Sequence, residues 1–506
     1  MYNYLVNGFK YGFDVGFRGS VHHNTVDNLL SAKTKPDIVR QKIQNEINAN
    51  RFVGPFDSKP FTEMQLSPLG LAEKKMPGTY RMIHHLSFPE GSSINDNIPQ
   101  DKCSVQYASI QDAIELIKSV GRKSFCAKTD ISSAFRIINI KESQYKLFGF
   151  MWEGKYYYDK NLQMGCSSSC QIFENFSTAI EWIAKNKVLI PNIVHILDDF
   201  MIVDKTEDGC KKKLERFLAI CKDMGIPISK EKTFQPSKVM SFVGYEIDTR
   251  LMEVRLPIDK LDKCHNLLTV VLQKEKITLR ELQSIIGTLN FACAVVIPGR
   301  AFLRRLIDLT IGVKKSFHRI RMTKSVKQDL NTWQNFLKNF NGKSLILSDR
   351  WLTSDQLHLF TDASGTYGYG ALFGSQWFLG KWDTKWQKQN IAFLELYPIV
   401  LAVEIWGHRF ENQCIYFHTD NIALASVINK QTSKDALIMF LIRRLVLHCL
   451  RNNVNFKAKQ IYGSKNVLAD ALSRQQVQKF HRLAPWADTV PKPVPNLPDL
   501  PSYRNP

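Results

Sequence analysis

Two adjacent aspartates, Asp198 and Asp199, stand between two apolar, β-prone runs at residues 195–197 and 200–203. This pattern predicts a hairpin with both carboxylates at its tip, where folding alone would favour Asn-Gly. Neighbouring carboxylates between strands repel each other and reduce stability unless a cation lies between them. A bound divalent metal ion is one explanation for the pair. A solvated turn is the other, and for an isolated Asp-Asp pair it is the commoner one.

A third carboxylate, Asp130, ends a β-prone run over residues 124–129. If this strand pairs with the hairpin in one sheet, the three carboxylates converge. Carboxylate oxygens suit Mg²⁺ or Mn²⁺. Two such ions can activate an attacking hydroxyl and stabilise a leaving phosphate. We therefore expect a site for two metal ions that carries out nucleotidyl transfer.

Two further segments could contact a nucleotide. Lys74 and Arg81 flank a turn at residues 76–79, a basic hairpin able to hold a triphosphate, although such tips are usually only solvated. Gly165 belongs to a Gly/Ser turn at residues 162–169, which opens an amphipathic helix expected over residues 170–185. Backbone amides at a helix start suit a phosphate or a base, and a plain N-cap is the simpler alternative.

Four more carboxylates lie near the ends of expected elements in the last part of the chain. Asp362 follows a strand over residues 357–361, and Glu395 lies early in a helix over residues 392–406. Asp420 ends a strand over residues 414–419, and Asp470 opens the final helix. Together they could bind two divalent ions that direct water onto a phosphodiester. Singly, each is compatible with an N-cap or an exposed charge.

The composition predicts a globular, multidomain, nucleic-acid-binding protein. The 506 residues are 44% hydrophobic, and 68 Lys and Arg against 47 Asp and Glu give a formal charge of +21. This excess suits a polyanion such as nucleic acid. The sequence contains no apolar run near the roughly 20 residues of a membrane span, so we expect no membrane partner. Ten scattered cysteines without a CxxC pair, and a start without a secretory pattern, predict an intracellular protein, cytoplasmic or nuclear.

The composition and the hydrophobic periodicity of the sequence change several times along the chain. A helix is expected at residues 37–50, and a Pro/Gly-rich loop follows at residues 54–78. Residues 257–308 have a helical pattern, with a capping box from Thr278 to Glu281, and a basic helical connector follows at residues 314–350. Residues 356–466 read strand, strand, strand, helix, strand, helix, helix, strand. A Pro-rich end follows at residues 484–506.

The order and spacing of these segments resemble the reverse transcriptase family of retroelements. The resembling segments are residues 67–70 with Lys74, then residues 81–87, 128–136, 162–169, 197–200, 229–233 and 242–248. The resemblance implies that Asp130, Asp198 and Asp199 bind the metal ions, and that Lys74 and Arg81 bind the incoming triphosphate. It implies further roles for other residues: Phe135 would exclude a ribose 2′-hydroxyl, Lys230 or Lys232 would protonate pyrophosphate, and Phe242, Gly244 and Tyr245 would hold the primer end.

Residues 361–364, 394–396, 419–421 and 466–474 resemble a retroelement ribonuclease H. The two resemblances imply a mixed α/β and α+β protein, a right-hand polymerase followed by a ribonuclease H-like domain. The expected divisions are an N-terminal extension (1–50), fingers and palm (51–249), a thumb-like helical region (250–312), a connection (313–355), the ribonuclease H-like domain (356–475) and a Pro-rich tail or linker (476–506). The implied partners are an RNA template, a DNA primer, deoxynucleoside triphosphates and RNA–DNA hybrids.

Residues 84–96, 285–292 and 297–300 look most like DIRS-type elements, which carry a tyrosine recombinase. No recombinase, protease, zinc-knuckle or integrase pattern is visible, so we expect a recombinase elsewhere in the same element. The chain also departs from the reverse transcriptase pattern: Ile196 replaces a common Tyr, and Gln163-Met164 replaces a common Pro-Phe or Pro-Gln.

Three other classes of protein remain open. An RNA-dependent RNA polymerase shares the palm carboxylates, but Phe135 and the attached nuclease pattern argue against it. A catalytically impaired, domesticated remnant would bind nucleic acid after losing carboxylates, and all seven are present. A basic chromatin protein would bind without metal-dependent turnover.

Overall fold

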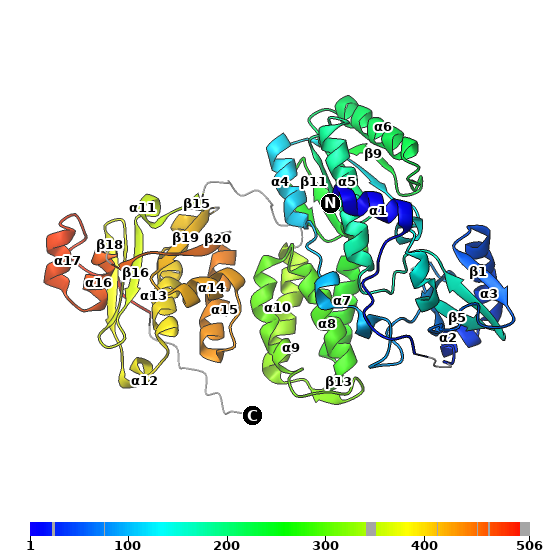
Figure 1. Cartoon of the computed structure of the whole chain (residues 1–506). Helices are drawn as coiled ribbons and strands as arrows, with labels where there is room; N and C mark the ends of the chain where they lie inside the picture. The colour runs from blue at the N-terminus through cyan, green and yellow to red at the C-terminus, as the bar shows by residue number, and fades with distance from the viewer. Residues whose placement is uncertain are drawn as a thin grey trace. The chain divides into compact units, whose positions relative to one another are not determined.

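The computed structural model describes residues 1–22, 26–74, 76–340, 351–411, 413–452, 454–463 and 466–495. The chain forms two compact units (Figure 1): the first comprises Met1–Val243 and Ile247–Leu251, and the second Gly244–Glu246 and Met252–Pro506. The passage between them lies close to the palm end expected at residue 249. The finer division into fingers, palm, thumb and connection stays a prediction.

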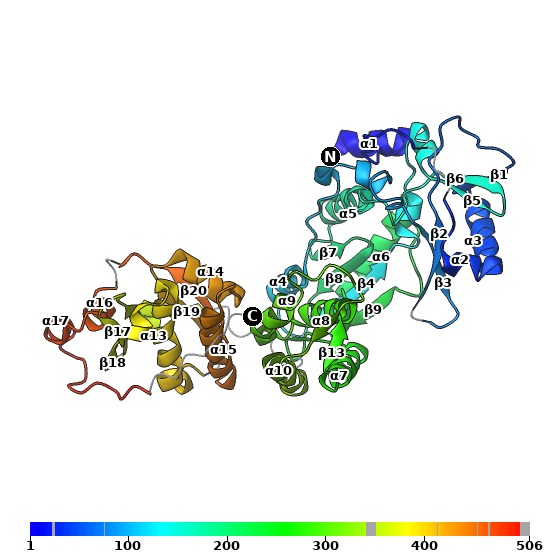
Figure 2. The same ribbon diagram turned by 90° about the horizontal axis from the view of Figure 1, so that it is seen from below.

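A four-stranded antiparallel sheet forms the centre of the first unit. Its order is β7 (Ile193–Ile196), β8 (Asp199–Asp204), β4 (Phe125–Asp130) and β9 (Phe234–Ser237), as Figure 2 shows. The strand ending at Asp130 and the Asp198–Asp199 hairpin therefore pair in one sheet, as predicted, with Asp130 opposite Asp199. Helices α4 (Ile110–Val120) and α6 (Glu207–Asp223) pack on β8, while α5 (Ser169–Asn186) packs on β7. The sheet thus has apolar neighbours on both faces, and Phe200, Met201 and Ile202 are all buried.

A second set of strands in this unit carries the segments that line the candidate site. The sheet order is β1 (Phe52–Phe56), β6 (Lys155–Asp159) and β5 (Gly149–Trp152), and a separate hairpin joins β2 (Leu69–Glu73) to β3 (Tyr80–His84). Helices α2 (Leu30–Lys33) and α3 (Pro36–Asn48) pack against these strands, and α3 lies where a helix was predicted. Residues 1–50, expected to be an extension, are part of this unit: Phe13, just after α1 (Tyr2–Tyr11), is 1% exposed in the same hydrophobic core as Phe200 and Ile202 of β8.

Short strands and helices make up the passage between the two units and the first part of the second unit. In chain order they are β10 (Val239–Phe242) and β11 (Tyr245–Asp248) at the passage between the units, then β12 (Glu253–Arg255), α7 (Ile258–Leu272), β13 (Lys276–Thr278), α8 (Leu279–Ala292), α9 (Arg304–Asp308), β14 (Arg319–Arg321) and α10 (Lys324–Phe340). The predicted capping box is present: the Thr278 side chain accepts from the Glu281 amide, and the Glu281 carboxylate accepts from the Thr278 amide. The stretch 257–308 is not helical throughout, because β13 pairs with β14.

The C-terminal block contains the predicted succession of strands and helices. In chain order its elements are β15 (Trp351–Leu352), α11 (Ser354–Leu357), β16 (Leu359–Ala363), β17 (Gly368–Phe373), β18 (Gln376–Lys381), α12 (Thr384–Gln387), α13 (Ile391–Trp406), β19 (Cys414–Thr419), α14 (Ile422–Lys430), α15 (Ala436–Arg451), β20 (Asn455–Gln460), α16 (Val467–Ser473) and α17 (Val477–Leu483). Figure 2 shows β17 and β18 between α13 and α16, and both helices pack on β16 and β17. The predicted Pro-rich tail lies partly outside the described residues.

One helical stretch in the described part of the chain, Ile391–Phe410, is long and apolar enough to cross a membrane by length and composition. Its most apolar window is 72% buried within the protein. The stretch contains α13, whose Tyr397 ring lies 5.0 Å from both Tyr369 and Trp386. Its apolar residues therefore belong to the core of the C-terminal block.

Gly370 provides a stability test of this block. A Cβ added at Gly370 would lie 2.4 Å from the Cβ of Leu472 on α16, so the helix would have to move. We expect Gly370→Ala to lower the free energy of unfolding by about 1–3 kcal/mol through overpacking. Gly365→Ala is the matched control, because its nearest contact is the Ile391 Cδ1 atom at 3.9 Å. Urea unfolding measures both, and equal midpoints would contradict the close approach of α16.

Candidate active sites

A pocket of about 420 Å³ in the first unit brings together five of the predicted site residues. Its walls come from α3, β2–β3, the turn after β4, the loop after β6 and the β7–β8 turn. The predicted residues on its walls are Lys74, Arg81, Asp130, Asp198 and Lys232. Acidic groups and a row of cations therefore face one volume, as a phosphate-bearing ligand held through metal ions would require.

The three palm carboxylates occupy different backbone positions. Asp130 ends β4, and Asp199 begins β8 directly opposite it. Asp198 lies in the turn, after Leu197 with its φ of +53°. The prediction that both aspartates lie at the hairpin tip is therefore wrong for Asp199, which is already a strand residue. The reason is that the turn begins one residue earlier than expected, at Leu197.

Lysine side chains lie on two of these carboxylates. Lys232 Nζ is 2.9 Å from both oxygens of Asp130, and Lys128 Nζ is 2.9 Å from Asp199 Oδ2. Burial raises the pKa of Asp198, and the charge of Asp130 raises it further. Burial also raises the pKa of Asp199 to about 6, although the charge of Lys128 lowers it. The cluster thus holds negative charge at an energetic cost that an added cation would relieve.

The donor chemistry of this cluster suits Mg²⁺ or Mn²⁺, because its ligands are carboxylate oxygens. Within the described ranges, however, no group of three or more His, Cys, Asp or Glu side chains is close enough to hold a metal ion as it stands. Lys232 is 60% exposed, so its ammonium group can move away from Asp130 without disturbing the core. Asp130 and Asp198 remain the pair that faces the pocket.

Other predicted residues lie outside this pocket. Phe135 is 7% exposed, and its ring centroid lies 5.0 Å from that of Phe173. Its neighbours Ala134 and Arg136 line the pocket, but Phe135 does not. Lys230 lines a separate hollow of about 540 Å³. Gly165 is required by close packing, because a Cβ there would lie 2.9 Å from the carbonyl oxygen of His84.

The predicted primer-holding turn is well defined locally. Phe242 is buried at the end of β10, and Gly244 has a φ of +83° in the turn to β11. The Tyr245 hydroxyl donates to the carbonyl of Phe291, and their rings stack at 4.4 Å. Tyr245 is therefore fixed to α8 rather than free to reach a ligand with its hydroxyl.

A buried histidine lies beside the turn between β7 and β8. His195 is flanked by two carboxylates: its Nδ1 contacts Glu181, and its Nε2 lies 3.3 Å from Glu174. Glu174 also accepts a hydrogen bond from the Leu197 amide at 3.2 Å, so helix α5 is tied to the turn before Asp198. Burial lowers the pKa of His195, but the two carboxylates outweigh burial and raise it to about 9.

The four carboxylates of the C-terminal block come from four elements. Asp362 lies within β16 rather than after the strand, and its Oδ2 accepts from the Ser473 hydroxyl at 2.6 Å. Glu395 on α13 accepts from the Thr419 hydroxyl at 2.6 Å, and Asp420 directly follows β19. Asp470 lies in the middle of α16 rather than opening the final helix, because α17 follows. Arg474, which directly follows α16, donates to Asp470 at 2.6 Å.

Burial and the charges of neighbouring carboxylates raise the pKa of two of these four groups, Asp362 and Glu395. Burial raises the pKa of Asp362 to about 6, with Ser473 opposing and the charges of Asp470 and Asp420 raising it further. Burial raises the pKa of Glu395 to about 7, and Asp420 and Asp362 add to the shift while Thr419 opposes it. The charges of Asp470 and Asp420 therefore act on Asp362, and those of Asp420 and Asp362 act on Glu395, while the shared metal site stays a prediction.

The sequence analysis missed several residues of the first pocket. Lys42, Glu46 and Arg51 come from α3 and the turn after it, and Arg136 follows Phe135. Only Arg136 carried a signal, because an Arg inside the apolar run 134–138 needs a buried partner. Lys42, Glu46 and Arg51 belong to an amphipathic helix and its end, where charges are usually solvated.

Comparison with known proteins shows which family the first unit resembles. Residues 72–247 match the family model of the reverse transcriptase (RNA-dependent DNA polymerase), and the chain is similar to that family over these residues. Its relatives are polyproteins of retroelements. The putative enzymatic polyprotein of Cassava vein mosaic virus is 24% identical over 375 residues, which cover 69% of this chain and 52% of the viral protein.

The retrovirus-related Pol polyprotein from transposon opus of Drosophila melanogaster is 21% identical over 491 residues, covering 91% of this chain and 44% of that protein. This chain thus spans about half, or less, of the length of these relatives. Among solved structures, the foamy viral protease-reverse transcriptase in complex with RNA/DNA hybrid has a TM-score of 0.53 at 17% identity, covering 87% of this chain and 55% of that one. A second foamy viral structure, the dRH form with double-stranded DNA, also has a TM-score of 0.53, at 18% identity, and covers 88% of this chain and 73% of that one. These likenesses support a polymerase fold that mixes α and β elements.

The raised pKa of His195 predicts a pH dependence of stability. Its folded-state pKa of about 9 exceeds the ordinary value of 6.5, so its stabilising contribution is complete below pH 6.5 and is lost as the pH rises through about 9. The shift corresponds to ~3 kcal/mol. We expect the free energy of unfolding of the parent chain to fall by ~3 kcal/mol as the pH rises from 6.5 to above about 9. The free energy of unfolding of His195→Gln should fall much less. Urea unfolding across this range measures the difference, and parallel pH profiles would contradict the ion pairing.

Proposed function

We propose that the chain is an RNA-directed DNA polymerase that copies retroelement RNA into DNA. The observation that carries the proposal is the first-unit pocket, in which Asp130 and Asp198 face Lys74 and Arg81 across one volume. A cationic wall opposite paired carboxylates suits a nucleoside triphosphate bound through divalent cations. The match of residues 72–247 to the reverse transcriptase family supports the same reaction.

Each residue then has a defined part in the reaction. Asp130, Asp198 and Asp199 would hold two Mg²⁺ or Mn²⁺ ions, which activate the primer hydroxyl and stabilise the leaving phosphate. Lys74 and Arg81 bind the β- and γ-phosphates and neutralise the departing pyrophosphate. Lys232, on the pocket wall, can give a proton to pyrophosphate. This position favours Lys232 over Lys230, which lines a different hollow.

We further propose that the C-terminal block is a ribonuclease H that cuts the RNA strand of RNA–DNA hybrids. The pKa values of Asp362 and Glu395, raised by burial and by the charges of nearby carboxylates, support a second acidic cluster with Asp420 and Asp470. Its four carboxylates would hold two divalent ions that activate water. The Ser473 and Thr419 hydroxyls orient two of the carboxylates. Hybrid recognition would rely on A-form shape and 2′-hydroxyls rather than on sequence.

The biological context remains part of this proposal. The segments quoted for DIRS-type elements support an element of that kind, with its tyrosine recombinase elsewhere. An RNA template, a DNA primer, RNA–DNA hybrids and deoxynucleoside triphosphates would be the partners, and the cell interior, cytoplasmic or nuclear, the location. A domesticated binding remnant is the alternative, and it predicts binding without turnover.

Primer extension on an RNA template, with cleavage of a labelled hybrid measured alongside, tests both activities. We expect Asp198→Asn to reduce synthesis by roughly 100-fold or more while hybrid cleavage stays, and Asp470→Asn to do the reverse. Asp208→Asn is the matched control, because Asp208 is 72% exposed on α6 and should leave both activities unchanged.

The two-site assignment fails if either variant loses both activities while remaining folded. A parent chain that binds primer and template but neither extends nor cuts them identifies the domesticated remnant instead. The salt dependence of nucleic-acid binding does not distinguish the active enzyme from the domesticated remnant, because both would bind phosphates.

Sugar selection gives a second test of the polymerase assignment. If Phe135 excludes the 2′-hydroxyl, Phe135→Val should raise the use of ribonucleotides relative to deoxynucleotides at least roughly tenfold. The ratio of the two kcat/KM values is the readout, because a loss of packing on Phe173 lowers both together. An unchanged ratio would remove Phe135 from substrate selection, in keeping with its burial.

A further inference from the structure

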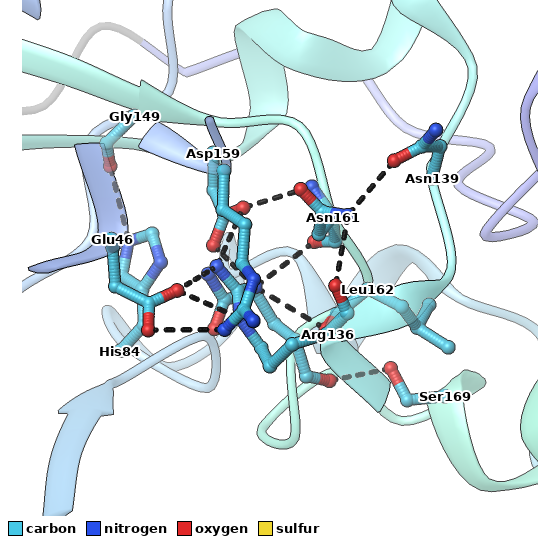
Figure 3. Close-up of polar contacts among 11 residues, drawn as sticks. Glu46, His84, Arg136, Asn139, Gly149, Asp159, Asn161, Leu162 and Ser169 are labelled. Carbon is cyan, nitrogen blue, oxygen red and sulfur yellow. Dashed lines mark hydrogen bonds and ion pairs between the residues drawn. The ribbon is translucent and has the colours of Figure 1, made fainter. Parts of the chain in front are cut away.

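Arg136 is a pocket-lining arginine whose guanidinium is already fully engaged by protein groups. Its Nη1 and Nη2 atoms donate to the two oxygens of Asp159 at 2.7 and 3.0 Å. Its Nε and Nη2 atoms donate to Glu46 Oε2 at 3.2 and 2.9 Å. Figure 3 shows the guanidinium between these two carboxylates. A side chain with all three nitrogens committed does not hold a triphosphate, unlike Lys74 and Arg81 on the same walls.

Arg136 and two of the groups that it binds belong to, or directly adjoin, three different walls of the pocket. Glu46 lines the pocket from α3, and Arg136 itself lines it from the turn after β4. Nη1 also lies 3.3 Å from the carbonyl oxygen of Leu162, next to the pocket-lining pair Gln163 and Met164. One planar cation therefore joins segments that are 26 and 90 residues away from it in the sequence.

The anchor of this network is completely buried. Asp159 is 0% exposed at the end of β6, and its Oδ1 also accepts from the Asn161 amide at 2.8 Å. Asn161 in turn donates from Nδ2 to the Arg136 carbonyl at 3.0 Å and to Asn139 at 2.8 Å (Figure 3). Both the side chain and the backbone of Arg136 are thus held from the β6 side. The Ser169 hydroxyl fixes the next carbonyl of this loop, that of Gln163, at 2.5 Å.

We propose that Arg136 is a positioning residue for the incoming nucleotide, and that its bidentate pair with Asp159 sets the spacing between the post-β4 turn, the Gln163–Met164 loop and α3. The inference rests on the proposed polymerase function and adds the residue that shapes its nucleotide pocket. Lysine cannot replace it, because a single ammonium lacks the planar fork that serves Asp159, Glu46 and the Leu162 carbonyl together. The expected consequence is weaker nucleotide binding without weaker primer–template binding.

Equilibrium binding of a deoxynucleoside triphosphate with Mg²⁺ tests this role in the full chain, on a primer–template whose primer lacks a 3′-hydroxyl. We expect Arg136→Lys to raise the nucleotide Kd roughly tenfold or more, since small misplacements of binding groups have large effects. The Kd for the primer–template should stay within about twofold. Arg250→Lys is the control, because it alters another Arg–Asp pair, with the 1% exposed Asp248, away from the pocket.

A double variant separates positioning from mere stability. Arg136→Met with Asp159→Leu removes both charges, and apolar replacement of a buried ion pair is often neutral for folding. If the network only stabilises the fold, this variant regains both the thermal midpoint and the nucleotide Kd of the parent, which overturns the proposal. We expect the thermal midpoint to recover and the nucleotide Kd to remain raised, because the contacts to Glu46 and Leu162 are absent.

The two levels of the account can fail separately. A parent chain that binds the nucleotide but never extends a primer overturns the polymerase function, while the Kd comparison still decides the role of Arg136. The positioning role is overturned if the parent and Arg136→Lys bind the nucleotide with the same Kd. It is also overturned if the parent does not bind the nucleotide.

Discussion

The constraint on which the first unit depends is the repulsion among three carboxylates held by an apolar sheet. The pairing of β4 with β8 puts Asp130 directly opposite Asp199, and the buried residues that follow Asp199 prevent the register from slipping. Neither carboxylate can move away, so neutralisation has to come from nearby cations. Lys128 and Lys232 supply it here, and the exposure of Lys232 makes that neutralisation exchangeable. Divalent cations that arrive with a nucleotide would take over the same role.

The basic residues of the pocket suit this arrangement, because the proposed triphosphate would bring further negative charge to the carboxylates. Lys74 and Arg81 come from a hairpin, where they can adjust to a ligand. Arg136 faces the same volume, but Glu46 and Asp159 hold it, so it shapes the pocket instead of binding within it. In the C-terminal block, partly buried carboxylates are held by hydrogen bonds rather than by lysine side chains. There Asp362 and Glu395 lie on a strand and a helix, and neighbouring hydroxyls from Ser473 and Thr419 take the place of lysines.

Local sequence was enough to predict the elements but not all of their details. The capping box at Thr278, the helix over α3 and the strand–helix order of the C-terminal block each depend on neighbouring residues, and each is confirmed. The place of Asp199 was mispredicted because Leu197, not an aspartate, takes the left-handed backbone position, which leucine rarely adopts. The pairing of β13 with β14 and the contact of Arg136 with Glu46 join residues far apart in sequence. No periodicity or turn signal records such contacts. The motif resemblance predicted roles for all seven carboxylates, three in the first unit and four in the C-terminal block. The lysine, arginine and hydroxyl groups that contact them became visible only in the structure.

The proposed function requires that each of two separate acidic clusters binds divalent cations. Direct titration of the full chain with Mn²⁺, with the free ion followed by electron paramagnetic resonance, tests this without relying on catalysis. The account predicts that Asp130→Asn and Asp362→Asn each remove part of the Mn²⁺ bound by the parent, and that the double variant loses both parts. Mn²⁺ binding by the double variant equal to that of the parent would contradict it.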